Sequence, residues 1–231
     1  VALSSLSSAF RDSLLNQLEE ARVAHGPATA YATPRRLAVV VDQVASKQRD
    51  EAVSRRGPAI AAAFAADGAP TKAALGFARS CGVDVEALGR ETTEKGSWLR
   101  FEQRLSGEPV SALLASLIES ALADLPIPKR MRWGDRDEEF VGPVHWVCVR
   151  FGNEMVGGQV LGLPIGNSTR GHRFHAPEPR PIASASTYLE TLREAYVEPD
   201  FSARRSLIRQ QVEALASDAG GHARIDAAVL D

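Results

Sequence analysis

The sequence is poor in cysteine and in aromatic residues. Among 231 residues there are two cysteines, and Phe, Trp and Tyr together make up 6%. Cys81 and Cys148 both stand among small or apolar neighbours, which is typical of free buried thiols in a reducing compartment and argues against a disulfide framework. With so few aromatic rings, the hydrophobic core has to be built mainly from Ala, Leu and Val.

Two further absences limit the partners of the chain. No apolar run approaches the ~20 residues that a membrane-spanning helix needs, so no membrane partner is expected. The formal net charge is −2, so the protein as a whole is not attracted to nucleic acid. Any binding of RNA or DNA must therefore come from local clusters of Arg and Lys.

Motifs that carry catalysis are also missing. Neither common type of Gly-rich phosphate-binding loop is present, no G-x-S-x-G marks a serine nucleophile, and no H-E-x-x-H marks a zinc site. The sequence therefore offers binding surfaces and no complete catalytic set. We assign no catalytic residue, metal or cofactor to this chain.

Hydrophobic periodicity predicts an α+β fold. Apolar residues recur every three or four positions over residues 3–21, 110–125, 186–196 and 202–219, as on one face of a helix. Shorter helices are expected over residues 59–66 and 71–81. Strand patterns cover residues 37–41 and 155–163, a hairpin is expected over 91–105, and an edge strand or loop over 49–56. Because helices and strands do not alternate regularly, the expected architecture is a mixed sheet with packed helices.

Residues 172–175 read His-Arg-Phe-His and are the most suggestive tetrapeptide in the chain. Two imidazoles three positions apart could bind a metal, with His145 as a third ligand, although no Asp, Glu or Cys stands nearby to complete the site. Alternatively, this segment is a strand with one imidazole in the core. In a third interpretation, the imidazoles face a ligand beside Arg170 and Arg173.

Two other segments contain clusters of cationic residues. Residues 129–133 read Lys-Arg-Met-Arg-Trp, and such residues suit RNA because guanidinium groups pair with phosphate and flat rings stack on unpaired bases. If the segment is a strand, Arg130 and Arg132 share one face, while the alternative is a solvated face with Trp133 in the core. Arg35 and Arg36 follow a proline, and one of them needs a buried partner or a ligand.

Several short motifs stand in the same order as in a known family. They are Thr33-Pro34-Arg35-Arg36-Leu37-Ala38-Val39, Gly57-Pro58-Ala59, Pro70-Thr71-Lys72-Ala73-Ala74, Gly76-Phe77-Ala78-Arg79, Lys95-Gly96, residues 125–134, Phe140-Val141, Pro143-Val144-His145-Trp146 and Thr169-Arg170-Gly171-His172-Arg173-Phe174-His175. Together they resemble the N-terminal part of the β subunit of bacterial glycyl-tRNA synthetase of the two-subunit type, over nearly the whole chain. One departure is Gly142, where the family pattern has an arginine, and this removes one candidate RNA contact.

The resemblance implies a cytoplasmic role in joining glycine to tRNA-Gly at the expense of ATP. The catalytic core, with its ATP and Mg, would belong to a separate α subunit, so this chain alone would be inactive. The expected partners are tRNA-Gly, the α subunit and later domains of the same β chain. The expected fold is similar to the editing module of the phenylalanyl-tRNA synthetase β chain. It would occupy residues 1–200 of a longer protein, with residues 201–231 leading to an HD-type domain.

The resemblance and the cation clusters together yield a set of predicted tRNA contacts: Arg35, Arg36, Lys129, Arg130, Arg132, Arg170, His172, Arg173 and His175. Two alternatives remain open. The domain could be an architectural docking module in which these arginines form internal salt bridges, or an editing or metal-dependent hydrolase that uses His145, His172 and His175. Editing is not needed on physical grounds, because glycine has no smaller amino-acid competitor and a tight pocket excludes alanine by overlap.

Overall fold

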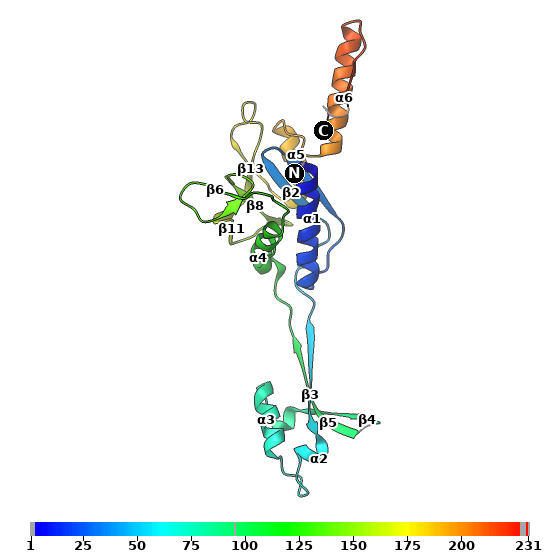
Figure 1. Cartoon of the computed structure of the whole chain (residues 1–231), viewed down its shortest axis with the longest axis vertical. Coiled ribbons are helices and arrows are strands. Elements are labelled where there is room, and N and C mark those ends of the chain that lie inside the picture. Colours follow the sequence, from blue (N-terminus) through cyan, green and yellow to red (C-terminus); the bar gives the residue numbers. More distant parts are fainter. Residues whose placement is uncertain (1–2, 95, 227–229, 231) are drawn as a thin grey trace. The chain divides into compact units, whose positions relative to one another are not determined.

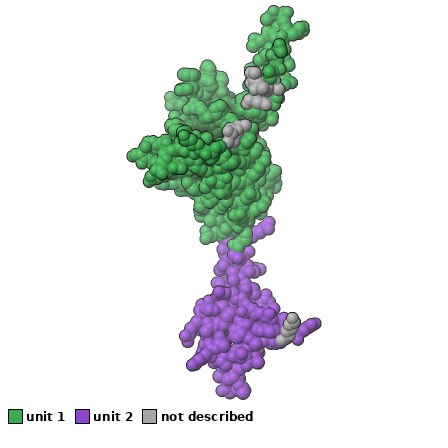
Figure 2. Space-filling view, in the orientation of Figure 1, with its two compact units in different colours: residues 1–48, 108–231 green, residues 49–107 purple. Residues whose placement is uncertain are grey.

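The computed structural model describes residues 3–94, 96–226 and 230, in two compact units (Figure 2). Unit 1 comprises residues 1–48 and 108–231, and unit 2 comprises residues 49–107, which lie between these two parts in the sequence. The α+β class is confirmed, since helices and strands are mixed along the chain. The sequence predicts one domain over residues 1–200 and does not anticipate unit 2 as a separate body.

Two helices and a β-hairpin pack together in unit 1 (Figure 1). Helix α1 (Leu3–Glu20) packs against α4 (Val110–Ala123) and against strands β1 (Ala28–Thr33) and β2 (Arg36–Val41). The apolar stripe of α1 is buried as its periodicity predicts, through Leu6, Phe10, Leu14 and Leu18. Because burial of each such side chain contributes about 1.5–3 kcal/mol, this stripe holds α1 in place.

The turn between β1 and β2 decides where Arg35 and Arg36 lie. The two strands are antiparallel, and their register pairs Thr33 with Arg36, so Pro34 and Arg35 form the turn. Proline has its φ fixed near about −65°, which favours a turn at this position. Consequently Arg35 is exposed at the tip of the hairpin, while Arg36 begins a half-buried strand.

The other strands of unit 1 are short and form several small sheets instead of the single mixed sheet that the sequence predicts. They are β6 (Met131–Arg132), β7 (Glu139–Phe140), β8 (Val147–Cys148), β9 (Arg150–Phe151), β10 (Glu154–Met155), β11 (Gln159–Val160), β12 (Leu163–Gly166), β13 (Ser168–Arg170) and β14 (Pro179–Pro181). Strand β12 is parallel to β8, and β13 pairs antiparallel with β14. Pairing of both kinds therefore occurs, but in separate pieces.

The prediction of one strand over residues 155–163 is wrong, because turns divide it among β10, β11 and β12. Gly158, Leu161 and Gly162 have φ of 116°, 50° and 66°, which an extended strand does not tolerate. The backbone at Gly158 also approaches α4 closely. A Cβ at Gly158 would lie 2.9 Å from the Cβ of Ala115 in α4.

The last two helices lie where the sequence predicts them. Helix α5 (Tyr188–Glu194) follows the 3-10 turn η2 (Ala185–Thr187), and α6 is Phe201–Asp218. The carboxylate of Asp200 accepts a hydrogen bond from the backbone N–H of Ala203 at 2.9 Å and so caps α6. No helix in the part of the chain that the structure describes is both long and apolar enough to cross a membrane.

Unit 2 is built around an antiparallel sheet in the order β3–β5–β4. Its elements are β3 (Glu51–Ala59), α2 (Ile60–Ala63), α3 (Lys72–Cys81), η1 (Val85–Ala87), β4 (Gly89–Thr93) and β5 (Gly96–Leu105). The edge strand and the hairpin are confirmed; Lys95 of the hairpin turn lies outside the described residues. The helix predicted over residues 59–66 shrinks to α2, because Phe64 forms a bridge with Pro70. Ala63, Ala74 and Leu99 form a separate small core in this unit.

Candidate nucleic-acid interface

A loop of unit 1, residues 170–176, is held against the end of α5 by close backbone packing. The N–H of His172 donates to the carbonyl of Ala195 at 2.9 Å, and the N–H of Ala176 donates to the carbonyl of His172 at 2.9 Å. At Gly171, a Cβ would lie 2.7 Å from the Cβ of Ala195 and 2.8 Å from the carbonyl oxygen of Ala176. Only glycine fits here, so the sequence itself fixes the approach of the two segments. The segment is a loop and not a strand, which overturns the interpretation of residues 172–175 as a core strand.

Four rings lie along the surface that this packing creates, and we call them the aromatic row: Phe174, His172, His175 and Tyr196. Neighbouring ring centroids in that order are 6.1 Å, 4.5 Å and 5.5 Å apart. Phe174 is 76% exposed and Tyr196 is 66% exposed, although both are large and apolar in part. Isolated exposed apolar residues are common, but a continuous row of them marks an interaction surface.

The backbone at Tyr196 is strained. Its φ is 59°, in the left-handed region, where a side chain with a Cβ costs about 1–2 kcal/mol. The turn after α5 needs this conformation, since the N–H of Tyr196 donates to the carbonyl of Arg193 at 3.0 Å and that of Val197 to Leu192 at 2.9 Å. The strain brings the ring of Tyr196 alongside His175, and the packing at Gly171 retains it there.

His172 is held by its own loop. Its Nδ1 accepts the backbone N–H groups of Phe174 at 3.3 Å and of His175 at 3.2 Å. With Nδ1 accepting, the neutral ring carries its proton on Nε2, which leaves that nitrogen as a donor toward a ligand. In the residues that the structure describes, no group of three His, Cys, Asp or Glu side chains is placed to hold a metal ion. The ligand set His145, His172 and His175 is therefore not assembled.

Two arginines of this segment lie near aromatic rings, one of which belongs to the aromatic row. The guanidinium of Arg173 is 5.2 Å from the ring centroid of Phe174, and that of Arg170 is 5.8 Å from the ring centroid of Trp146. Both residues are exposed, and neither forms an ion pair with any residue that the structure describes. Their charge therefore remains available to an anion from outside the chain.

Arg36 supports this loop from within. One of its terminal nitrogens donates a hydrogen bond to the backbone carbonyl of Arg170, while its Nε is buried without a hydrogen-bond partner. Burial lowers the pKa of Arg36 and the charge of Arg35 lowers it further, whereas Tyr188 acts in the opposite direction. Arg36 thus positions Arg170 and is less accessible than a direct phosphate contact would be. Arg35, exposed in the hairpin turn, is free to face a ligand.

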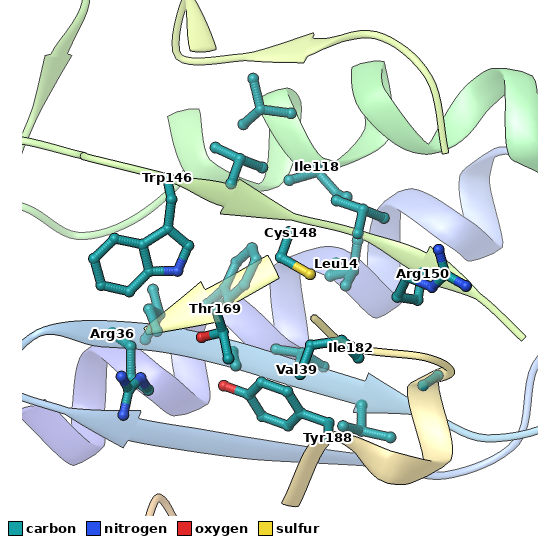
Figure 3. A pocket seen from close by; sticks show the side chains of 18 of the residues that line it. Leu14, Arg36, Val39, Ile118, Trp146, Cys148, Arg150, Thr169, Ile182 and Tyr188 are labelled. Carbon is teal, nitrogen blue, oxygen red and sulfur yellow. The ribbon is translucent and has the colours of Figure 1, made fainter. Parts of the chain in front are cut away.

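A cavity of about 1300 Å³ lies inside unit 1, next to the start of this loop (Figure 3). Arg36 and Trp146 lie on one side of it and Arg150 on the opposite side, with Thr169 and Tyr188 between them. The Nε of Arg150, like that of Arg36, is buried without a hydrogen-bond partner. Apolar side chains, among them those of Leu14, Val39, Ile118 and Ile182, also line the cavity.

Two of the groups that line the cavity, the Tyr188 hydroxyl and the Cys148 thiol, are protonated at neutral pH. Burial raises the pKa of Tyr188 to about 12, against the opposing charge of Arg36. Burial also raises the pKa of the Cys148 thiol, which the charge of Arg150 only partly offsets. A nucleophile needs a lowered pKa or an adjacent base. Tyr188 and Cys148 therefore have the character of a binding wall, and neither is an activated nucleophile.

In the second group of predicted contacts, residues 129–132, both arginines have partners within the chain. Arg130 donates to the carbonyls of Ala123 at 2.6 Å, Leu122 at 3.3 Å and Leu125 at 3.4 Å, and so covers the open end of α4. Arg132 is exposed but paired with carboxylates, at 3.0 Å from Glu139 and 3.8 Å from Asp137. Lys129 is exposed. Trp133 packs against the main hydrophobic core, as one of the two sequence interpretations expects.

The structure thus brings together Arg170, His172, Arg173 and His175, with Arg36 behind them, and uses Arg130 elsewhere. Sequence reasoning missed Tyr196, Phe174 and Trp146 as members of this surface. Phe174 carried a usable signal, because it stands between two candidate residues of one motif. Tyr196 carried none, since it is read from the sequence only as the end of a helix.

Fold and site define an α+β module that presents a cationic, aromatic surface suited to nucleic acid. A family model described as "Glycyl-tRNA synthetase beta subunit" matches residues 1–231. The chain belongs to the glycyl-tRNA synthetase β subunit family, and the resemblance found in the sequence is confirmed.

Relatives in this family are similar along the entire chain. The chain is 49% identical over 231 residues to the glycine–tRNA ligase β subunit of Hahella chejuensis and 50% identical over 230 residues to that of Chromohalobacter salexigens. The corresponding subunit of Stutzerimonas stutzeri is 46% identical over 230 residues. In each case the match covers 100% of this chain and 33% of the relative. The chain therefore spans about a third of the length of these relatives.

Proposed function

We propose that this part of the β subunit binds and positions tRNA-Gly for a glycine–tRNA ligase whose ATP-dependent chemistry takes place on a separate α subunit. The observation that carries the proposal is the surface of residues 170–175. It offers two exposed arginines that have no ion pair among the described residues: Arg170 near the half-buried ring of Trp146, and Arg173 near the exposed ring of Phe174. Gly171, between them, fixes the segment in place. Cations set next to flat rings suit RNA, because they meet phosphates while the rings meet bases.

Charge explains why a protein with a net charge of −2 can still hold an RNA. Affinity for a polyanion comes from cations that contact phosphates and release counterions, so local placement outweighs the total. Arg170 and Arg173 are not neutralised within the described part of the molecule, and Arg35 is exposed in the hairpin turn. We expect these three to contact phosphates, with Arg36 positioning Arg170 through its carbonyl.

The test is the salt dependence of tRNA-Gly binding, measured with the full-length protein. Replacing Arg170 and Arg173 by glutamine should weaken binding at low salt and reduce the slope of log affinity against log salt by about one for each phosphate that is deprived of its cation. Arg132→Gln is the matched control, because Arg132 is also exposed but already paired with Glu139. An unchanged slope in the Arg170/Arg173 double variant would contradict the proposal.

The cavity next to this surface favours binding over editing. The chemistry of Tyr188 and Cys148 described above lacks an activated nucleophile. Discrimination against alanine requires no second site, because a pocket shaped for glycine excludes the extra methyl group by overlap. We expect no hydrolysis of alanyl-tRNA-Gly by this module. Rapid hydrolysis that disappears in His172→Ala would instead support the hydrolase alternative.

A docking role for α6 is a second candidate, and one observation favours it. No described residue of α6 is buried, and Leu207, Val212 and Leu215 are between 40% and 68% exposed. Relatives of this chain are about three times as long, so later domains of the same β chain are the expected cover. In the full-length protein, Leu215→Asp should then lower stability and leave the salt slope of tRNA binding unchanged.

A further inference from the structure

We propose that the aromatic row binds unpaired nucleotides of the RNA, by stacking one base on Phe174 and another on Tyr196. The inference rests on the proposed function and deepens it, since it says which kind of RNA strand the surface recognises. A surface of cations alone would take any phosphate backbone. The row adds flat faces, which a base-paired helix cannot use because its bases are already stacked on each other.

The spacing of the rings shows where the bases can bind. Insertion of a base between two rings needs about twice the 3.4 Å stacking distance of nucleic acid. The centroid distances within the row, from 4.5 to 6.1 Å, are shorter than that. We therefore place the bases at the ends of the row, on Phe174 and Tyr196, which are 76% and 66% exposed.

The two central rings of the row, His172 and His175, would form hydrogen bonds to the RNA instead of stacking on its bases. His172 and His175 lie 4.5 Å apart, and the accepting role of Nδ1 in His172 leaves its Nε2 to donate. A donor between two stacked bases can reach the sugar hydroxyls or base edges of an unpaired strand. Metal binding does not account for the pair, because no third ligand is placed beside it in the described residues.

The way the row is built supports a binding role. Its members come from two segments, residues 172–175 and residue 196, that are joined by the hydrogen bond from His172 to Ala195 and by the packing at Gly171. Tyr196 reaches the row only through a left-handed backbone. Strain that is retained to display an exposed ring is expected at a functional surface.

Charge selects RNA over a protein partner as the occupant. Arg173 lies 5.2 Å from the ring centroid of Phe174, at one end of the row, and Arg170 is the last residue of β13, directly before the loop. An unpaired strand carries a phosphate beside each base, so it satisfies the arginines and the rings together. An apolar protein surface would satisfy the rings and leave both charges unpaired.

The test compares single-stranded and duplex RNA with the full-length protein. The probes are an unstructured oligonucleotide of about ten nucleotides, within the length range that such grooves cover, and a blunt duplex of the same sequence. The variant is the double substitution Phe174→Leu and Tyr196→Leu, which keeps apolar bulk and removes the π faces. We expect its affinity for the single strand to fall at least about tenfold and its affinity for the duplex to stay the same. Its salt slope should also stay unchanged, because no cation is removed.

Two controls protect this comparison. Phe174→Tyr with Tyr196→Phe exchanges the rings and should retain the single-strand affinity. Met155→Ala removes another exposed apolar side chain of unit 1, 60% exposed, and should have no effect on either probe. Circular dichroism and urea unfolding of each variant establish that the fold is intact.

Each outcome separates the inference from the proposed function. If the double leucine variant binds both probes like the wild type, while the Arg170/Arg173 variant still has a reduced salt slope, the stacking inference is overturned and the proposed function stands. An equal loss of affinity for the single strand and for the duplex in the double leucine variant would also overturn the stacking inference. If the leucine variant retains RNA affinity but no longer associates with the α subunit, the row is a protein contact. If the wild type binds neither probe nor tRNA-Gly, both proposals fail.

Discussion

Residues 129–133 and residues 169–175 contain similar types of residue, but their arginines have different partners in the folded protein. Both are short, rich in Arg, and contain a large aromatic residue. In the first segment, Arg130 bonds to three carbonyls at the end of α4 and Arg132 pairs with carboxylates. In the second, Arg170 and Arg173 lie over aromatic rings and have no ion pair among the described residues.

The two segments differ in whether the fold leaves the charge of their arginines unused. The arginines of the first segment stabilise the folded state through their carbonyl and carboxylate partners, because removal of such a cation leaves polar groups unpaired. A guanidinium beside a ring keeps its charge for another ligand. Internal partners of the kind that the docking alternative expects are found for Arg130 and Arg132, whereas Arg170 and Arg173 have no ion pair among the described residues.

Gly171→Ala is expected to have the largest effect on this contrast. The new Cβ would lie less than 3 Å from Ala176 and Ala195, and both contacts belong to fixed backbone or to atoms bound directly to it. Overpacking of this kind costs about 1–3 kcal/mol, and we expect the upper end because neither segment can withdraw. Urea unfolding measures the loss of stability, and tRNA affinity should fall with it because the loop is displaced.

Gly142→Ala is the matched control for that change. Gly142 is also in unit 1, but a Cβ there would meet nothing within 4 Å and its φ is not in the left-handed region. Its stability should stay within about 0.5 kcal/mol of the wild type, as is usual for surface substitutions. Equal losses of stability in the two alanine variants would show that the loop is not fixed by Gly171.

Arg130→Met should destabilise the protein by about 2 kcal/mol, since hydrogen bonds from a charged donor contribute about 1.5–3 kcal/mol and carbonyls at the end of α4 would lose their partner. Its salt slope for tRNA-Gly should not change. The measurement is urea unfolding beside a salt titration, with exposed Lys129→Met as control. A reduced salt slope with unaltered stability would make Arg130 an RNA contact and break the comparison.

We expect the folded protein to lose stability at alkaline pH because of Tyr188, which lies beside Arg36 in the cavity. Burial raises its pKa in the folded state to about 12, above its ordinary value of about 10. The stabilisation that this shift gives to the folded state is thus complete below pH about 10 and is lost as pH rises through about 12. The reason is that Tyr188 releases its proton at lower pH in the unfolded chain than in the folded one. We expect about 1.5 kcal/mol, less than the full shift implies, since the residue is only partly buried. Unfolding of wild type and Tyr188→Phe from pH 9 to 12 measures it, and parallel curves would exclude it.

The helices could be predicted because their information is local. In α1 and α4 the apolar residues recur on one face, and that face is the one the structure buries. The short strands of unit 1 could not be predicted to the same extent. Their ends are set by left-handed residues such as Leu161, whose backbone conformation the side chain does not reveal.

The candidate site was predicted in part for the same reason. Arg170, His172, Arg173 and His175 are neighbours in sequence, so a motif was enough to group them. Tyr196 joins them through a hydrogen bond between residues 172 and 195, and nothing in its own surroundings indicates that contact. The role of Arg130 depends on where α4 ends, and that of Arg132 on a hairpin partner, Glu139. Such partners are known only once the chain is folded.

Arg132→Gln is expected to have the smallest effect and is the sharpest check of the comparison. Arg132 is exposed and its pairs with Glu139 and Asp137 lie at the surface, where an ion pair is worth about 0–1 kcal/mol. Stability should therefore change by less than about 0.5 kcal/mol, and the salt slope for tRNA-Gly should stay that of the wild type. The decisive measurement is the slope next to that of Arg170→Gln, since both changes remove one exposed guanidinium. If the slope fell equally in the two variants, prior pairing with carboxylates would not distinguish the segments, and the choice of residues 169–175 as the RNA surface would have to be abandoned.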